Sequence, residues 1–184
     1  TWSEQRVYAA MPALARGRFV AYLHEANAWA PDHLSRLVQL VATRKLQWAS
    51  SLRVLTDPDG RVVASDDCDN VQPWNSSAGE PSNDASAYLL RTDIAVRAAR
   101  AWYARPMEEV PPPIAFCRHL HAHFPRTDTT GAYTLYARLE PSEAGEHRSL
   151  KEGRAETDRL DEGRLPWRKA PPPSVGTRMP GADG

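Results

Sequence analysis

The segment from residue 51 to residue 65 reads SLRVLTDPDGRVVAS and carries the strongest local structural signal in the chain. Two apolar runs, 52–55 and 61–64, flank a turn sequence that contains Pro58 and Gly60. Proline presets a negative φ in a turn, and glycine permits the positive φ that closes it. The pattern therefore predicts a β-hairpin over residues 52–64.

Helical patterns surround this hairpin. Just upstream, Asp32 can cap a helix whose apolar residues recur at three-and-four spacing, at Leu34, Leu37, Val38, Val41 and Leu46. The other elements expected from apolar spacing, turn residues and prolines are helices over residues 3–11, 12–30 and 84–105 and a strand over residues 132–139.

A scarcity of large aliphatic side chains limits the size of the core. Leu, Ile, Val and Phe account for 32 of the 184 residues, and only four of these lie beyond residue 140. Residues 140–184 are rich in Pro, Arg and Gly, and such a segment buries too little apolar surface to offset its ordering entropy. The sequence therefore predicts an α+β, mainly helical fold. A small helical globule with a short β-hairpin or small sheet would span residues 1–139, and an extended C-terminal arm would span residues 140–184.

Two tryptophans lie in segments without hydrophobic periodicity. Trp74 lies within an acidic loop, residues 65–83, and Trp167 precedes Arg168 in the proline-rich part of the arm. Trp and Arg are among the side chains that most often anchor protein–protein interfaces. Trp74, Trp167 and Arg168 are therefore predicted to bind a partner chain, which would also order the arm.

The segment 114–124 holds a cluster of metal-ligating residue types, Cys117, His119, His121 and His123. On a strand all four would share one face, whereas on a helix His119 and His123 would lie one turn apart. Imidazole and thiolate groups suit Zn²⁺, but four alternate strand residues span roughly 20 Å and cannot all reach one ion. His119, His121 and His123 are the candidate metal ligands, with a further ligand from elsewhere in the chain. The other interpretation is a half-exposed strand that binds no cofactor.

The charge balance removes some classes of partner. The chain carries 23 basic and 23 acidic side chains, so its formal net charge is zero with histidine neutral. Nonspecific binding to nucleic acid or to an anionic membrane needs an excess of positive charge. No apolar run approaches the length of about 18 residues that a transmembrane helix needs.

The N-terminal residues and the cysteines bear on the compartment. Residues 1–4 lack the basic start of a secretory signal, and Cys68 and Cys117 can form at most one disulfide. These features predict an intracellular, reducing location. Thr1 in place of Met fits either a removed leader or a numbering that starts inside a longer chain, and if the source is eukaryotic a processed Thr1 would suit a mitochondrial location.

The sequence contains no glycine-rich phosphate loop, no Gly-x-Ser-x-Gly elbow and no Cys-x-x-Cys pair. This favours a noncatalytic accessory or structural subunit of a larger multiprotein assembly, such as a mitochondrial complex, that docks by its extended arm. Two alternatives stay open. One is a metal-binding domain or metal-dependent enzyme built on the three histidines. The other is a winged-helix-like nucleic-acid module in which Arg36, Arg44 and Lys45 contact phosphates, although the hairpin tip is acidic.

Overall fold

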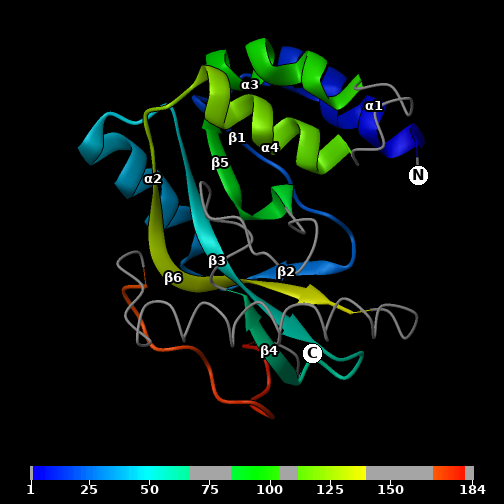
Figure 1. Ribbon diagram of the computed structural model, residues 1–184, viewed down its shortest axis with the longest axis vertical. Helices are drawn as coiled ribbons and strands as arrows, with labels where there is room; N and C mark the ends of the chain where they lie inside the picture. Colours follow the sequence, from blue (N-terminus) through cyan, green and yellow to red (C-terminus); the bar gives the residue numbers. More distant parts are fainter. Residues whose placement is uncertain (1, 67–83, 104–111, 140–167, 181–184) are drawn as a thin grey trace.

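The fold is taken from a computed structural model, which describes residues 2–66, 84–103, 112–139 and 168–180. Its centre is a curled six-stranded mixed sheet (Figure 1). The strands are β1 (Phe19–Ala21), β2 (Asn27–Trp29), β3 (Trp48–Thr56), β4 (Val62–Asp66), β5 (Tyr88–Arg91) and β6 (Thr127–Arg138). The helices are α1 (Trp2–Ala10), α2 (His33–Arg44), α3 (Thr92–Ala98) and α4 (Pro112–His123), with 3-10 turns η1 (Met11–Leu14), η2 (Ala85–Ala87) and η3 (Ala99–Tyr103).

Strand β3 organises the sheet. It runs antiparallel to β5 over its first residues and antiparallel to β4 over its last, while β6 pairs with it in parallel. The edge strands β1 and β2 pair antiparallel with β5 and β6, so the order is β1-β5-β3-β6-β2 with β4 also paired to β3. Every residue of β3 is buried, because both of its faces and both of its edges are covered.

The prediction of a mainly helical fold is wrong, because the sheet dominates the architecture. Residues 12–30 do not form one helix: after η1 the chain enters the short strands β1 and β2. Residues 84–105 begin with η2 and β5 and become helical only at Thr92. In both segments pairing with distant strands outweighs local helical spacing, since β1 and β5 bind each other along the sheet.

Several local predictions are confirmed. The hairpin forms as β3 and β4, and the helix over residues 32–46 appears as α2. The predicted strand over residues 132–139 coincides with the last part of β6, which ends at Arg138. The helix expected over residues 3–11 appears as α1. The strand interpretation of residues 114–124 is wrong, because all of them but Phe124 belong to α4, which begins at Pro112 and ends at His123. Proline fits the first turn of a helix, where its missing N–H has no intrahelical partner.

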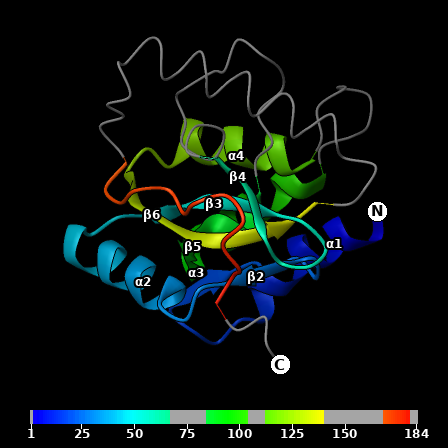
Figure 2. The ribbon, with the colours of Figure 1, turned by 90° about the horizontal axis from the view of Figure 1, so that it is seen from below.

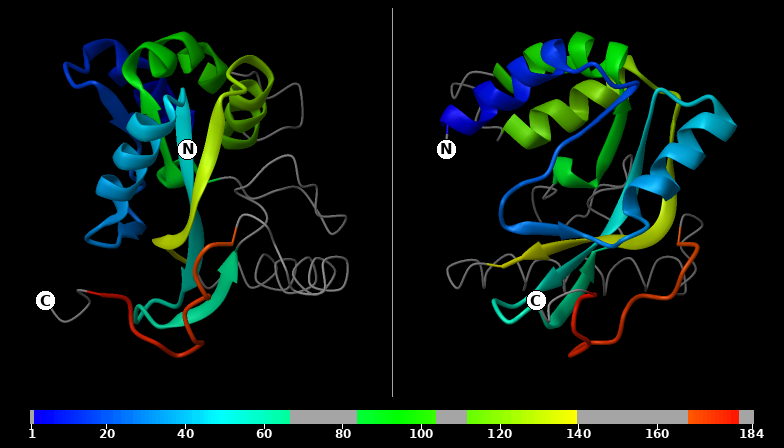
Figure 3. Two further views of the ribbon diagram at one scale, coloured as in Figure 1. Left: turned by 90° about the vertical axis from the view of Figure 1, so that its left-hand side faces the viewer. Right: turned by 180° about the vertical axis from the view of Figure 1, so that it is seen from behind.

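Helices α1, α3 and α4 gather at one end of the sheet, and α2 lies apart from them (Figures 1 and 3). The main core lies between the three gathered helices and the sheet and contains the fully buried Trp48, Trp102 and Phe116. A second cluster under α2 includes Leu37 and Val41. Val41 of α2 and Leu89 of β5 both belong to this second cluster, which packs the end of the helix on the sheet.

The described part of the arm, residues 168–180, lies along the molecule's own hairpin (Figure 2). The N–H of Val62 donates to the carbonyl of Thr177 at 2.8 Å, and the N–H of Met179 donates to the carbonyl of Gly60 at 3.0 Å. Farther back, Lys169 Nζ donates to the carbonyl of Thr129 at 2.9 Å. For these residues the surface that orders the arm is the globule itself.

Candidate functional site

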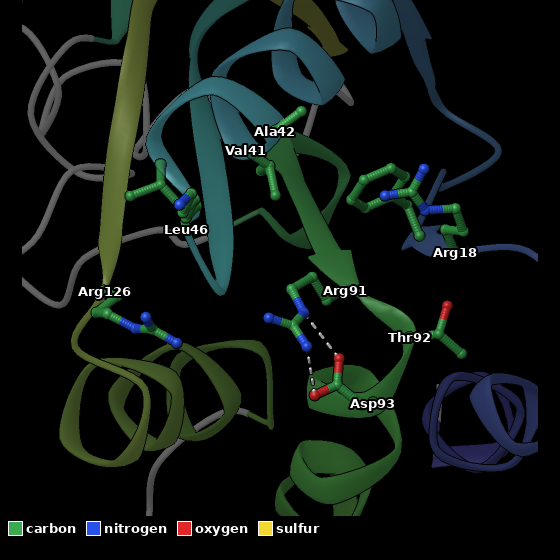
Figure 4. A pocket seen from close by; sticks show the side chains of 10 residues that line it. Arg18, Val41, Ala42, Leu46, Arg91, Thr92, Asp93 and Arg126 are labelled. Carbon is green, nitrogen blue, oxygen red and sulfur yellow. Dashed lines mark hydrogen bonds and ion pairs between the residues drawn. The ribbon is translucent and has the colours of Figure 1, made fainter.

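A cleft of about 590 Å³ opens between the C-terminal end of α2 and the neighbouring edge of the sheet (Figure 4). Its lining residues are Arg18, Phe19, Val41, Ala42, Lys45, Leu46, Arg91, Thr92, Asp93 and Arg126. The volume lies within the range of roughly 300–1,000 Å³ that is typical of small-molecule sites.

Four cations line the cleft, and they stand at the ends of four adjacent strands. Arg18 precedes β1, Arg91 ends β5, Lys45 lies just before β3 and Arg126 just before β6. Strand β5 is antiparallel to β1 and β3, and β6 is parallel to β3. The start of β1, the end of β5, the start of β3 and the start of β6 therefore lie at the same end of the sheet, and the four cations lie there with them. The sheet order β1-β5-β3-β6 therefore arranges the cations in a row.

Backbone hydrogen bonds fix this row. The carbonyl of Gln47 accepts from the N–H of Arg91 at 3.1 Å, while the N–H of Gln47 donates to the carbonyl of Arg126 at 2.8 Å. The N–H of Thr92 donates to the carbonyl of Arg18 at 3.1 Å, and its hydroxyl donates to the carbonyl of Gly17 at 2.6 Å. The backbones of the three arginines are thus linked across the sheet edge through residues 47 and 92.

Arg91 is the one cation of the row with an acidic partner inside the cleft. Its Nε donates to Asp93 Oδ1 at 3.0 Å, and its Nη2 donates to Asp93 Oδ2 at 3.2 Å. Such a fork orients the guanidinium plane. Among the described residues Arg18, Lys45 and Arg126 form no ion pair, and all three are exposed, so the cleft keeps a positive excess.

Lys45 has an unusual backbone that places it at the cleft. It ends α2 in the left-handed region with φ 52°, a conformation that favours Gly or Asn at this position. The chain reverses there, so that Leu46 turns inward and is 9% exposed while Lys45 remains at the surface. A non-glycine residue in this region carries strain of about 1 kcal/mol or more, which is compatible with a functional role.

The wall opposite the row is apolar. Val41, which is 3% exposed, and Leu46 belong to the cluster under α2, and Phe19 packs against the same cluster. Figure 4 shows Arg126 and Arg91 on one side of the cleft, Leu46, Val41 and Ala42 on the other, and Arg18 at one end. The site therefore offers a charged rim to an anion and an apolar wall to the remainder of a ligand.

Helix α4 separates the three predicted metal ligands. The rings of His119 and His123 lie together, with centroids 4.3 Å apart, as the one-turn spacing of a helix requires. His121 points elsewhere and meets the edge of the buried Trp48 at 4.8 Å. Within the described ranges no group of three or more His, Cys, Asp or Glu side chains is placed to hold a metal ion.

Cys117 is buried on α4 beside Tyr88, whose hydroxyl lies 3.2 Å from the Cys117 Sγ. Burial is the main cause that raises the pKa of the Cys117 thiol to about 11. A thiol that stays protonated at neutral pH is neither an active nucleophile nor a ready metal ligand. This pair therefore contributes to the core.

The other predicted site residues fall into two groups. Trp74 and Trp167 lie outside the described residues, and Arg168 is half-buried at the start of the described arm. Of the cations predicted to contact phosphate, Arg36 pairs with Asp32 at 2.5 Å and Arg44 pairs with Asp128, whereas Lys45 lines the cleft. The hairpin does not project as the wing of a winged-helix module would, because its first strand, β3, lies inside the sheet.

No protein-family model matches the chain, and no curated protein sequence matches it. Among the helices of the described ranges, none combines the length and the apolar character needed to cross a membrane.

Proposed function

We propose that this chain is an accessory subunit of a larger protein assembly, which it joins through an apolar stripe on its N-terminal helix. The stripe consists of Val7, Met11 and Leu14, whose exposed fractions are 53%, 53% and 72%. Residues spaced by four and three fall on one side of a helix, and the 3-10 turn η1 keeps residues 11 and 14 aligned. This stripe is the observation that carries the proposal.

The opposite side of the same helix is also apolar. Ala9 and Pro12 are buried, and the ring of Tyr8 packs on Tyr22 and Trp102 with centroid distances of 5.5 Å and 5.2 Å. A helix that is apolar on both sides normally lies inside a protein. The segment from α1 to η1 has its inner side on the core and its outer side in water, which favours a covering partner.

The charge beside the stripe favours one kind of partner. Arg16 is exposed two residues beyond Leu14, at the end of the stripe. An amphipathic helix of another subunit, with an apolar ridge and carboxylates beside it, would complement both features. The proposal retains the intracellular placement, mitochondrial in a eukaryote, and assigns the docking role to this stripe in place of residues 168–180.

The double variant Met11→Asp with Leu14→Asp is expected to weaken the association by roughly tenfold or more, because two charges would enter an apolar interface. The measurement is size exclusion of the tagged chain in native extracts of its source, where the wild type elutes with the assembly and the variant elutes as a monomer. Leu34→Asp is the matched control, since Leu34 is 41% exposed on α2.

Hydrogen exchange locates the interface within the purified assembly. Amides of residues 5–14 should exchange more slowly in the assembly than in the isolated chain, with no comparable slowing in α2. A wild-type chain that elutes as a monomer, or unchanged exchange over residues 5–14, would contradict the proposal. Urea denaturation must place both variants within about 0.5 kcal/mol of the wild type, as expected for surface substitutions.

A further inference from the structure

We infer that the cleft at the end of α2 binds an organic diphosphate, with the diphosphate along the row of Arg18, Arg91, Lys45 and Arg126 and the organic group on the apolar wall. This inference is independent of the proposed assembly function, because the cleft and the stripe on α1 and η1 share no residue.

The length of the row points to more than one anionic group. Arg18 and Arg126, at its two ends, directly precede β1 and β6, which lie three strand spacings apart in the order β1-β5-β3-β6; at about 4.8 Å each these amount to roughly 14 Å. One phosphate or carboxylate covers only part of that distance. Two linked phosphates can contact successive cations, and the row supplies a different strand end for each contact.

The charge of the cleft suits the same ligand. Lining cations outnumber the single lining carboxylate by four to one, and that carboxylate, Asp93, is engaged by Arg91. The arginine forks match the oxygen geometry of phosphates, while Lys45 adds a point charge. The chain as a whole is neutral, so this excess is a local feature of one edge of the sheet.

The row is preorganised, which lowers the cost of binding. The backbones of Arg91 and Arg126 are joined through Gln47, and the backbone of Arg18 is joined to Thr92. Asp93 orients the Arg91 guanidinium before any ligand arrives. Preorganised groups lose less conformational entropy on binding, so a larger part of the favourable contact energy appears as affinity.

The apolar wall requires a ligand with an organic part. Phe19, Val41 and Leu46 line the cleft together with the cations, and the Arg18 guanidinium lies 5.7 Å from the centroid of the Phe19 ring. The volume of the open cleft, about 590 Å³, exceeds what inorganic diphosphate fills. Nucleoside diphosphates and isoprenoid diphosphates share the required chemistry. An organic diphosphate should therefore bind more tightly than inorganic diphosphate through the additional apolar contact.

Isothermal titration calorimetry of the isolated full chain tests this inference with four probes: inorganic phosphate, inorganic diphosphate, ADP and geranyl diphosphate. One of the two organic diphosphates should bind at least roughly fivefold more tightly than inorganic diphosphate, and inorganic phosphate should bind most weakly. Tighter binding of ADP would indicate a nucleoside diphosphate as the ligand, and tighter binding of geranyl diphosphate would indicate an isoprenoid diphosphate.

Arg126→Gln and Arg18→Gln should each weaken binding of the better probe by roughly tenfold or more, because each removes charge-assisted hydrogen bonds to phosphate. Arg36→Gln is the matched control and should change affinity less than twofold. Arg36 lies on α2, the helix whose C-terminal end lines the cleft, but it pairs with Asp32 near the N-terminal end of that helix.

Three results would overturn the inference. The first is no binding of any diphosphate at millimolar concentration, and the second is an equal loss of affinity in the Arg36→Gln control. The third is tighter binding of a short oligothymidylate than of either organic diphosphate, with the same loss in Arg126→Gln, which would assign the row to nucleic acid. None of them bears on the stripe at Val7, Met11 and Leu14.

Discussion

Replacing Trp102 with alanine is expected to lower the free energy of unfolding by about 3–5 kcal/mol, the range seen for large aromatic side chains deleted from a core. Trp102 lies on η3 and is 2% exposed. Its ring stacks on Phe116 with centroids 4.3 Å apart and also contacts Tyr8 and Tyr22. The indole therefore joins three separate parts of the chain, and no neighbouring side chain can fill its volume.

The same substitution should loosen the N-terminal helix in particular. Tyr8 of α1 packs on Trp102 and Tyr22. Without the indole, hydrogen exchange over residues 5–14 should accelerate more than exchange in α2, whose core cluster is separate.

Urea denaturation followed by far-UV circular dichroism measures the effect. Tyr103→Ala is the matched control, because Tyr103 is the next residue and is 50% exposed, so its loss should cost less than about 1 kcal/mol. Equal destabilisation by the two variants would show that the aromatic cluster does not carry the contact between α1 and the sheet.

Sequence reasoning recovered the elements whose signals are local. The turn around Pro58 and Gly60 predicts the hairpin, and the glycine has the positive φ of 74° that the turn requires. The spacing of Leu37 and Val41 predicts α2, and both side chains are buried. Such signals need no knowledge of distant partners.

The errors lie where distant segments decide the structure. Phe19 pairs with Arg91 and Trp29 pairs with Leu135, and nothing within residues 12–30 encodes those partners. The alternation of His119, His121 and His123 fits a strand locally, but α4 packs its apolar residues, such as Phe116 and Leu120, into the core.

The candidate site was hidden for the same reason. Its four cations are far apart in sequence, and only Lys45 drew attention as a phosphate contact. Arg18, Arg91 and Arg126 each stand at a strand end, and they meet only once the strand order is known. A search for cations at the ends of expected strands would have missed all three arginines, because residues 18 and 91 fell within expected helices and Arg126 lies six residues before the expected strand over residues 132–139.

Acidification is expected to destabilise the protein through His33. This side chain is fully buried, stacks on Trp29 with centroids 4.8 Å apart, and places Nδ1 2.8 Å from Thr134 Oγ1. Burial is the main cause that lowers the pKa of His33 to about 4, with smaller opposing effects of Thr134 and Asp32. In the unfolded chain the pKa of His33 returns to about 6.5.

The direction of the effect follows from proton binding. Between pH 6.5 and pH 4 the unfolded state holds a proton on His33 that the folded state excludes, so stability is complete above this window and declines as pH falls through it. From pH 7 to pH 4.5 this one group should remove roughly 2–3 kcal/mol. Burial also lowers the pKa of His121, which acts in the same direction.

The variant His33→Phe separates this contribution from all other titrating groups, because the ring can still stack on Trp29 but cannot bind a proton. At pH 7 the variant should be less stable by about 1 kcal/mol, since the contact to Thr134 is lost. At pH 4.5 it should be the more stable protein, so the two curves of unfolding free energy against pH should cross. Urea titrations at pH 7, 6, 5 and 4.5 measure both curves, with the exposed His123→Gln as the control. Parallel curves would mean that His33 accepts its proton without unfolding, and that the buried stack opens to water in the acidic range.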